Sequence, residues 1–224
     1  WILDGERIPM ARVAALMALV CVACGRQAAG VDRTEVTVGE YRECVKAGKC
    51  TEPGRQWKTC NWSPAAGSRE LHPVNCVTHD QAAAYCAWRS KRLVRNDEHT
   101  AAVSGNASRR YPWGDALPSA ELLNACGAEC VAAGAGPTSM FGASDGFVTT
   151  APRGSYVAGQ SSEGVFDLSG NVAEWVEDPT TGSSLVRGGS FADADAADVS
   201  AAGAHAVSLD ATLPTIGFRC ARSP

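Results

Sequence analysis

The sequence predicts a single irregular domain of the α+β class over residues 31–224, and three observations support this prediction. The first is the content of 23 Gly and 11 Pro, which places much of the chain in turns and loops. The second is a pair of capping boxes, each of which opens a short helix. The third is a small number of short strand-like segments, with no internal repeat and no linker between domains. The predicted domain therefore has few regular elements joined by many turns.

Residues 1–30 are expected to be an upstream stretch followed by a targeting segment. After Met10, residues 13–23 form an apolar run that is too short to span a membrane and is typical of a signal peptide. The run ends at Cys24 in a sequence similar to a bacterial lipoprotein signal, in which Cys24 would carry the lipid. Plain secretion is the alternative, because Cys21 stands where such signals usually have Leu. Both alternatives predict an exported protein, secreted or held at the cell envelope, with membrane contact only through a lipid anchor.

Each capping box predicts one helix. In residues 37–40 (TVGE), the Thr side chain can accept from the backbone of the Glu while the Glu side chain reaches back, so a helix is expected to run to about residue 46. Residues 78–81 (THDQ) have the same arrangement and open a helix that is expected to continue through Arg89. Apolar residues recur along the second helix at helical spacing, and Cys86 is among them. The Cys86 side chain is therefore expected to point into the core.

Short strands are expected at residues 33–36, at residues 185–191, where a Gly-Gly pair predicts a bulge, and at residues 216–220. The segments between them carry turn signals. Residues 50–74 are rich in Pro and Gly turns, and residues 131–163 are rich in Gly, Ala, Ser and Thr without a sustained period. The strands are thus expected to be brief and widely separated along the chain.

The charge of the chain argues against a nucleic-acid partner. The net charge is −4, the isoelectric point is near 5.6, and no basic stripe interleaved with aromatic residues is present. Proteins that bind nucleic acid carry such a basic patch or stripe.

The cysteines predict disulfides. In an exported chain, the eight that follow the targeting segment allow up to four bridges, and 105 pairings are open in principle. Zinc is the alternative, but paired Cys-x-x-Cys motifs are missing and His72, His79, His99 and His205 show no ligand spacing. Cys126 and Cys130 are close enough in sequence for a local bridge. The eight residues are Cys44, Cys50, Cys60, Cys76, Cys86, Cys126, Cys130 and Cys220.

Eight segments, in order along the chain, resemble the formylglycine-generating enzyme family, also called the sulfatase-modifying factor domain. They cover the chain from about residue 33 to its end. The resemblance implies a variant of the C-type-lectin-like fold that is poor in regular secondary structure and is stabilised by calcium and disulfides. The matching segments are TEVTVGEY (34–41), HPVNCV (72–77), AAAYCAW (82–88), RYPWGD (110–115), DGFVTTAPRGSY (145–156), GVFDLSGNVAEW (164–175), VRGGSF (186–191) and GFRCA (217–221).

Residues 164–175 form the first expected calcium site. Two carboxylates separated by a Gly-containing turn offer hard oxygen ligands, which suit Ca²⁺ better than zinc or copper. The resemblance implies that the ligands are the side chain of Asp167, the carbonyl groups of Gly170 and Val172, and the carboxylate of Glu174. The alternative is that Asp167 caps the turn and Glu174 is solvated.

The resemblance implies a second calcium site as well. Its ligands would be the side chain of Asn124, the carbonyl of Ala125, the side chain of Asp145 and the carbonyl of Phe147. We refer to the two expected groups of ligands as the first set and the second set.

The resemblance also implies a disulfide between Cys86 and Cys220, which would join the second predicted helix to the last predicted strand. Closing a loop of this length restricts the unfolded chain strongly, by about 4 to 5 kcal/mol in the chain-entropy model. Cys44, Cys50, Cys60 and Cys76 are expected to form two further bridges, and no pairing among them is favoured.

The chain departs from the family where copper would bind. Family members that oxidise a sulfatase cysteine to formylglycine hold copper through two cysteines between the RGGSF and GFRC segments. Residues 192–216 contain no cysteine, and soft Cu(I) prefers thiolates. The family's arginine-bearing segment is replaced by residues 199–204, and its RLPTE-x-EWE stretch by residues 92–100. Copper and formylglycine generation are therefore not expected, and no catalytic residue is assigned.

Other relatives are non-haem iron enzymes, whose iron histidines come largely from an additional helical domain that this chain has no room for. An iron site built from His72, His79 or His205 with an acid is the alternative. Asp193, Asp195 and Asp198 lie near His205 in sequence, and this acidic cluster is expected to be mostly a solvated loop.

The chain also begins its domain abruptly. Relatives have a GGxFxMG-type strand roughly 25 residues before the TEVT segment, whereas here the apolar run meets residue 31 directly. The domain is expected to lack this first strand, unless the gene model is faulty.

Three functions follow from these observations. The favoured one is an exported binding or accessory module, stabilised by calcium and disulfides, whose partner is an unknown protein or glycan. The first alternative is a metal-dependent oxidoreductase of the non-haem iron type. The second is a pseudoenzyme that is decaying without function.

Overall fold

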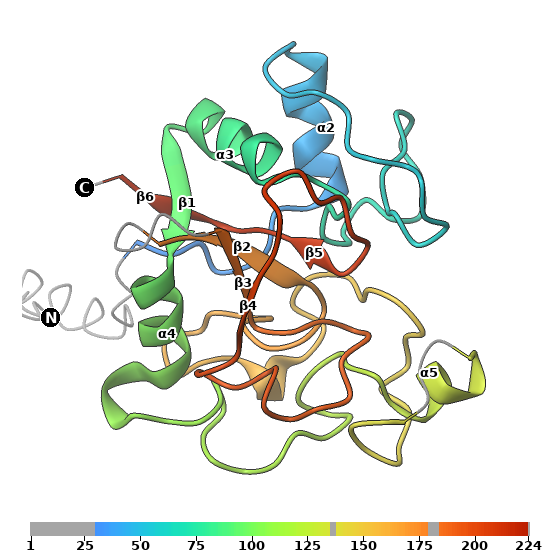
Figure 1. The fold of residues 1–224 in the computed structure, drawn as a ribbon, viewed down its shortest axis with the longest axis vertical. Helices are drawn as coiled ribbons and strands as arrows, with labels where there is room; N and C mark the ends of the chain where they lie inside the picture. The colour runs from blue at the N-terminus through green and yellow to red at the C-terminus, as the bar shows by residue number, and fades with distance from the viewer. Residues whose placement is uncertain (1–29, 135–137, 179–183, 224) are drawn as a thin grey trace, which may run out of the picture.

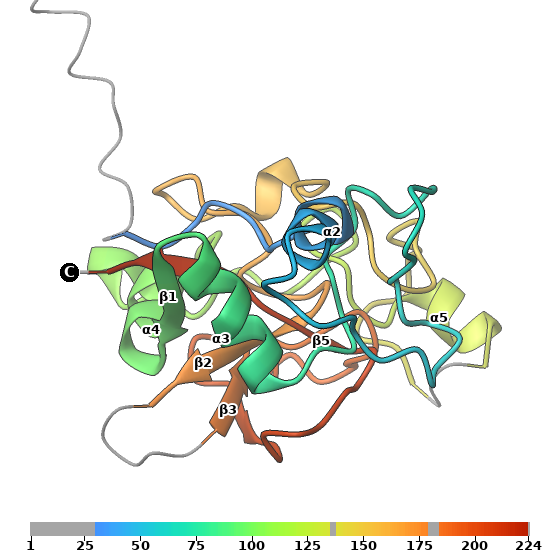
Figure 2. The ribbon, with the colours of Figure 1, turned by 90° about the horizontal axis from the view of Figure 1, so that it is seen from above.

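The computed structural model describes residues 30–134, 138–178 and 184–223. The expected targeting segment, with Met10, Cys21 and Cys24, lies outside the described residues. The described residues confirm the irregular α+β class, because short helices and strands are separated by long turn-rich segments (Figures 1 and 2). Among them, no helix is both long enough and apolar enough to cross a bilayer.

The helices and strands are short. The helices are α2 (Val38–Lys46), α3 (His79–Trp88), α4 (Asn96–Ser104) and α5 (Ala128–Ala132), with 3₁₀ turns η1 (Gly105–Ala107) and η2 (Val157–Gly159). The strands are β1 (Lys91–Arg95), β2 (Ala173–Glu177), β3 (Ser184–Arg187), β4 (Ala204–Ala206), β5 (Ile216–Gly217) and β6 (Cys220–Arg222).

Both predicted capping boxes are formed. The Thr37 hydroxyl accepts from the Glu40 amide at 3.2 Å, and the Glu40 carboxylate accepts from the Thr37 amide at 3.0 Å. Thr78 and Gln81 make the same pair of bonds at the start of α3. These reciprocal bonds satisfy amides that would otherwise lack a partner in the first turn, so α2 and α3 begin where the sequence predicts.

The strands form one small sheet in the order β4-β3-β2-β1-β6, and β5 pairs with β2. β2 runs parallel to β1 and to β5, and the other pairs are antiparallel. β2 contains Glu174 and Trp175, so one member of the first calcium set, Glu174, lies within the sheet. The sheet therefore fixes the position of Glu174.

Three strand predictions were wrong in detail. Residues 33–36 form no strand, because their backbone bonds go to separate segments near Phe166, Phe218 and Val74. The strand expected over residues 185–191 ends at Arg187, because positive φ angles at Gly188 and Gly189 turn the chain away. The last predicted strand is split into β5 and β6, which pair with different neighbours.

The main core lies between the sheet and the pair of helices α2 and α3, which lie together at one end of the molecule in Figure 1. Aromatic rings fill it. Tyr41 stacks on Tyr85 with ring centroids 5.6 Å apart and meets Trp62 and Phe218 edge to face. Trp175 from β2 is fully buried in the same core and donates its indole N–H to the Val77 carbonyl.

Four disulfides join the described cysteines, and none of the eight is left as a thiol. Cys86 of α3 is joined to Cys220 of β6, as the resemblance implied. The local bridge between Cys126 and Cys130 is also formed. The four cysteines whose pairing was open are joined as Cys44–Cys50 and Cys60–Cys76.

Candidate functional site

Asn171 is the centre of a buried polar network that connects the two calcium sets. Its side-chain oxygen accepts from the Asn124 side chain at 3.0 Å and from the Ala151 amide at 2.8 Å. Its side-chain nitrogen donates to both carboxyl oxygens of Glu35 at 3.0 and 3.1 Å. The residue has a φ of 62°, a region that Asn tolerates better than most residues. Asn171 was not among the residues predicted from the sequence, although a Gly-Asn pair in a turn is a recognisable signal for this conformation.

In the first set, Glu174 is bound by an arginine of its own chain. Both carboxyl oxygens of Glu174 accept from Arg219, at distances of 2.7 to 2.9 Å. Both side chains are buried, with 1% of Glu174 and none of Arg219 exposed, so the alternative that Glu174 is solvated is wrong. Arg219 also donates to the carbonyl groups of Phe166 and Asp167. Arg219 was not among the residues predicted from the sequence.

Asp167 is also buried, and its carboxylate accepts from the Gly154 amide at 2.5 Å. Burial raises the pKa of the carboxyl groups of Glu35, Asp167 and Glu174, and the guanidinium of Arg219 opposes this rise. One guanidinium therefore faces three carboxyl groups in a region that excludes water. One guanidinium cannot compensate three ionised carboxyl groups, which favours protonation of one of them or binding of a further cation.

The structure brings the side chain of Asp145 together with Ala125 and Phe147 of the second set. The two Asp145 oxygens accept from the amides of Ala125 and Phe147, each at 2.9 Å. The side chain of Asn124 is fixed through its nitrogen, which donates to the carbonyl group of Thr149 and to Asn171. The Asn124 oxygen is buried and has no hydrogen-bond partner among the described residues.

A second carboxylate faces Asp145. It belongs to Glu129, whose two oxygens are buried without a hydrogen-bond donor among the described residues. Burial raises the pKa of Asp145 to about 6; the amides of Phe147 and Ala125 oppose this rise, and the nearby Glu129 adds to it. Glu129 was not predicted from the sequence, because it belongs to no motif of recognisable spacing.

The two sets differ in how well they fit calcium. The second set offers an unpartnered amide oxygen and the Asp145 carboxylate, with the Glu129 carboxylate beside it, and such oxygens are the hard ligands that Ca²⁺ prefers. In the first set, the carboxylate of Glu174 is already neutralised by Arg219. The second set is therefore the better candidate for a calcium site.

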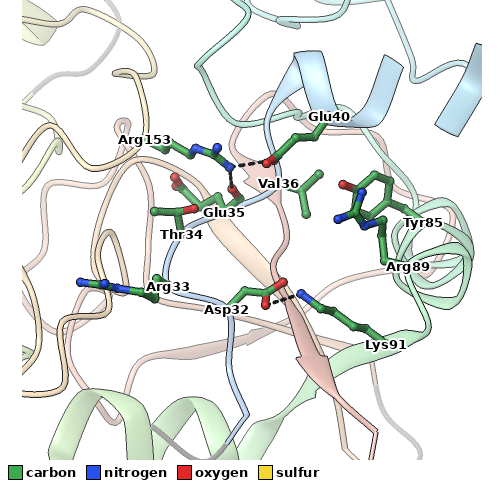
Figure 3. A pocket seen from close by; sticks show the side chains of 10 residues that line it. All are labelled: Asp32, Arg33, Thr34, Glu35, Val36, Glu40, Tyr85, Arg89, Lys91 and Arg153. Atoms are coloured by element: carbon green, nitrogen blue, oxygen red, sulfur yellow. Dashed lines mark hydrogen bonds and ion pairs between the residues drawn. The ribbon is translucent and has the colours of Figure 1, made fainter. Parts of the chain in front are cut away.

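Glu35 also lines a polar cavity of about 330 Å³ (Figure 3). Two ion pairs line it: Lys91 with Asp32 at 2.6 Å, and Arg153 with Glu40 at 2.7 Å. The cavity thus presents charges of both signs. It is lined by Asp32, Arg33, Thr34, Glu35, Val36, Glu40, Tyr85, Arg89, Lys91 and Arg153.

A wider cavity, of about 600 Å³, borders residues 192–216, where copper-binding relatives have their cysteines. Its walls come from α4, from residues 108–110 and from residues 197–202. The lining side chains are small or hydroxylated apart from Arg109 and Arg110, and none of them is a cysteine. The cavity therefore offers hydrogen bonds and positive charge but no thiolate.

The four histidines lie apart from one another. His72 contacts Thr150, His79 packs edge-on against Trp175, and His99 is buried with Nε2 3.8 Å from Glu174. His205 Nε2 lies 3.0 Å from Asp198 Oδ1. Within residues 30–134, 138–178 and 184–223, no group of three His, Cys, Asp or Glu side chains could hold a metal.

The acidic cluster near His205 is held more firmly than a solvated loop would be. Asp193 accepts from the amide and the hydroxyl of Ser190, at 2.7 and 2.8 Å, and Asp195 caps the amide of Ala197. Burial raises the pKa of Asp193. Only Asp195 of the three aspartates is exposed.

The stability of the fold should fall as the pH is lowered from about 6.5 to about 4, in part because of His72. Burial and the charge of Arg69 lower the pKa of His72 to about 4. The unfolded chain, with an ordinary histidine pKa near 6.5, therefore binds more protons than the folded chain in this window, which favours unfolding. Urea unfolding at several pH values should show this slope, and His72→Gln should reduce it. An unchanged slope in the variant would contradict the assignment.

Comparison with known proteins identifies a family that matches this chain. The family described as "Sulfatase-modifying factor enzyme 1-like domain" matches residues 26–224. The solved structure of PvdO from Pseudomonas aeruginosa superposes with a TM-score of 0.66 at 23% identity, over 87% of this chain and 80% of that chain. This likeness supports the fold alone.

Three curated relatives carry different names. The chain is 30% identical to "Hercynine oxygenase" of Mycolicibacterium smegmatis, over 66% of this chain and 37% of the relative. It is 34% identical to "Formylglycine-generating enzyme" of Streptomyces coelicolor, over 68% of this chain and 53% of the relative. It is also 34% identical to "Inactive C-alpha-formylglycine-generating enzyme 2" of Bos taurus, over 70% of this chain and 53% of the relative. The chain thus spans about half, or less, of the length of these relatives.

Proposed function

Because the chain belongs to the family of the sulfatase-modifying factor enzyme 1-like domain, we propose that it is a member without copper chemistry that acts as an exported binding or accessory module. The fold of the chain, which is similar to that of PvdO, agrees with this family. The missing copper chemistry is inferred from the cysteines.

The state of the cysteines carries this proposal. Copper-dependent relatives need two nearby thiolates, and soft Cu(I) is held by sulfur ligands. Every cysteine among the described residues is consumed in one of four disulfides, and residues 192–216 contain none. No thiolate therefore stands beside the 600 Å³ cavity. The bovine relative that is named inactive indicates that the scaffold can outlast the formylglycine-generating activity.

Export is supported by the same disulfides. Four bridges in one domain are typical of proteins that mature in an oxidising compartment, because cytosolic thiols are kept reduced. The apolar run at residues 13–23 would direct such export. For a partner, we propose a protein or glycan that contacts the two cavities, since both have hydrogen-bonding side chains in their lining.

A conversion assay tests the loss of copper chemistry. The purified chain, with Cys21 and Cys24 replaced by serine, is loaded with Cu(I) and given a sulfatase peptide with its target cysteine, under oxygen. We expect no aldehyde in the peptide by mass spectrometry, while the relative from Streptomyces coelicolor serves as the positive control. Copper-dependent conversion above the rate without protein would contradict the proposal.

Calcium is the cofactor that we propose, with the second set as its principal site. The ligands would be the side chains of Asn124 and Asp145 and the carbonyl groups of Ala125 and Phe147. The support is the unpartnered Asn124 oxygen and the buried carboxylate pair beside it. A bound Ca²⁺ would neutralise these oxygens and tie the loop around residue 145 to the loop around residue 124. Its proposed role is structural.

Calcium at about 100 times its dissociation constant should raise the free energy of unfolding by about 3 kcal/mol, because it binds only the folded chain. Thermal and urea unfolding in CaCl₂ and in EDTA measure this change. Asp145→Asn should abolish it, whereas Asp195→Asn, on an exposed loop, should leave it intact. If calcium stabilises Asp145→Asn as much as the unmodified chain, calcium does not bind at the second set. The variant Asp167→Asn then tests whether calcium binds at the first set.

One observation favours the alternative function, an iron-dependent oxidoreductase. His205 and Asp198 lie 3.0 Å apart within residues 192–216, and an imidazole with a carboxylate supplies two of the three protein ligands of a non-haem iron site. One relative is named an oxygenase. Stoichiometric Fe(II) that is lost in His205→Ala would support this alternative, and failure of the chain to retain Fe(II) would count against it.

A further inference from the structure

The Cys126–Cys130 disulfide closes a small ring that contains Glu129. The two cysteines are four residues apart and their Cα atoms are 5.1 Å apart. The ring spans the start of α5, which lies at one edge of the molecule away from the sheet in Figures 1 and 2. Glu129 is therefore carried on a surface turn, although its carboxylate is buried against Asp145.

Two contacts attach this turn to its neighbours: the disulfide, and a backbone bond from the Ala128 amide to the Ala143 carbonyl at 3.0 Å. α5 has only five residues, and Cys130 is the one buried residue that it contributes. A helix of this length has little stability of its own. Cys126, in contrast, is fixed by its backbone, which donates to the Asp193 carbonyl at 3.0 Å and accepts from the Met140 amide at 2.7 Å. The bridge thus links the short helix α5 to Cys126, whose backbone is held by hydrogen bonds.

The absence of a side chain at Gly127 leaves space for the Glu129 carboxylate next to the backbone. A Cβ atom at Gly127 would lie 2.7 Å from one Glu129 oxygen and 2.8 Å from the Ala143 carbonyl oxygen. A side chain at this position would therefore displace the carboxylate or the loop. Apart from the neighbouring carboxyl group of Asp145, no hydrogen-bonding side chain or amide among the described residues meets either oxygen of Glu129, so a cation between the two carboxylates would find both oxygens available.

We propose that Glu129 is an additional carboxylate ligand of the cation bound by the second set, and that the Cys126–Cys130 disulfide holds it there. The inference rests on the proposed calcium site. It predicts that calcium binding and the redox state of this disulfide are linked. By reciprocity, breaking the disulfide weakens calcium binding by the same factor by which calcium opposes reduction.

The redox step is simple thiol–disulfide exchange with a dithiol. The reductant supplies two electrons and two protons, the bond between the sulfur atoms breaks, and Cys126 and Cys130 become thiols. The reductant's own dithiol becomes a disulfide. The freed turn would then no longer hold the Glu129 carboxylate against Asp145, and the site would lose one negative ligand. Because ligand charge sets calcium affinity, we expect about a tenfold loss or more.

Calorimetric titration of CaCl₂ into the full chain tests this inference. Glu129→Gln and the pair Cys126→Ser/Cys130→Ser should each weaken binding about tenfold or more, and combining them should add little. Two controls are matched: Glu121→Gln, an exposed glutamate before the site, and Cys44→Ser/Cys50→Ser, a bridge with a similarly short loop. Both controls should bind calcium as the unmodified chain does. Circular dichroism in EDTA checks that each variant is folded.

The outcomes separate this inference from the proposed calcium site. If the unmodified chain binds no calcium, both are wrong. If it binds calcium and Glu129→Gln binds equally well, only the role of Glu129 is wrong, and an unchanged cysteine pair would overturn the link to the disulfide.

A second readout does not depend on folding of the cysteine variant. Alkylation and mass spectrometry follow the reduction of Cys126–Cys130 by dithiothreitol. Calcium should slow this reduction in the unmodified chain and have little effect in Glu129→Gln, and equal protection in both would contradict the link.

Discussion

Replacing Cys86 and Cys220 with alanine should lower the free energy of unfolding by about 5 kcal/mol, the largest effect that we expect from any disulfide here. The bridge spans 134 residues, so its loss frees a long loop in the unfolded chain. It also joins α3 to β6 at the buried core, where Cys86 and Cys220 are at most 1% exposed. Urea unfolding under non-reducing conditions measures the change.

The Cys44–Cys50 bridge supplies the control. It spans only six residues, so Cys44→Ala/Cys50→Ala should cost about 2 kcal/mol in the same chain-entropy model. Equal losses in the two double variants would show that loop length does not govern the stabilisation.

Arg219→Met should lower the free energy of unfolding by about 3 to 5 kcal/mol. The guanidinium is fully buried and is the partner of the Glu174 carboxylate, so its removal leaves a buried negative charge uncompensated. Glu35 and Asp167 lie close enough to add to the repulsion. Because protonation removes that charge, the loss should be smaller at pH 5 than at pH 8. Urea unfolding at the two pH values measures both effects.

Two further variants make this result interpretable. Arg219→Met combined with Glu174→Gln should be more stable than Arg219→Met alone, because the unpaired carboxylate is gone. Lys46→Met, which removes one side of an exposed ion pair with Glu43, should change stability by less than about 1 kcal/mol. A loss below about 1 kcal/mol in Arg219→Met would mean that the buried charges are not coupled as the contacts indicate.

Local signals in the sequence predicted local structure well. The capping boxes at Thr37 and Thr78 placed the starts of α2 and α3, because each box depends on residues only three apart. The resemblance implied the Cys86–Cys220 bridge. By contrast, β1, α4 and β2 were not predicted. α4 lacks a side-chain cap at Arg95, and the strands are set by pairing partners that are distant in sequence.

The interior of the site depended on long-range contacts that no single motif encodes. Arg219 meets Glu174 across 45 residues, and Asn171 meets Glu35 across 136. Glu129 lies near Asp145, 16 residues further along the chain, in a turn that is bridged by Cys126–Cys130 and has Gly127 close to the Glu129 carboxylate. The sequence could therefore suggest which oxygens bind a cation, but not that an arginine already neutralises Glu174.

We propose that this family member has a scaffold stabilised by calcium and lacks the thiolates for copper chemistry. Metal analysis of the folded chain tests it most directly, after exposure to equal concentrations of Ca²⁺, Cu(I) and Fe(II) without oxygen and removal of free ions by gel filtration. Cys21 and Cys24 are replaced by serine, so that only the four bridged pairs remain. We expect the chain to retain calcium and neither copper nor iron. Copper or iron retained at one equivalent per chain would contradict it.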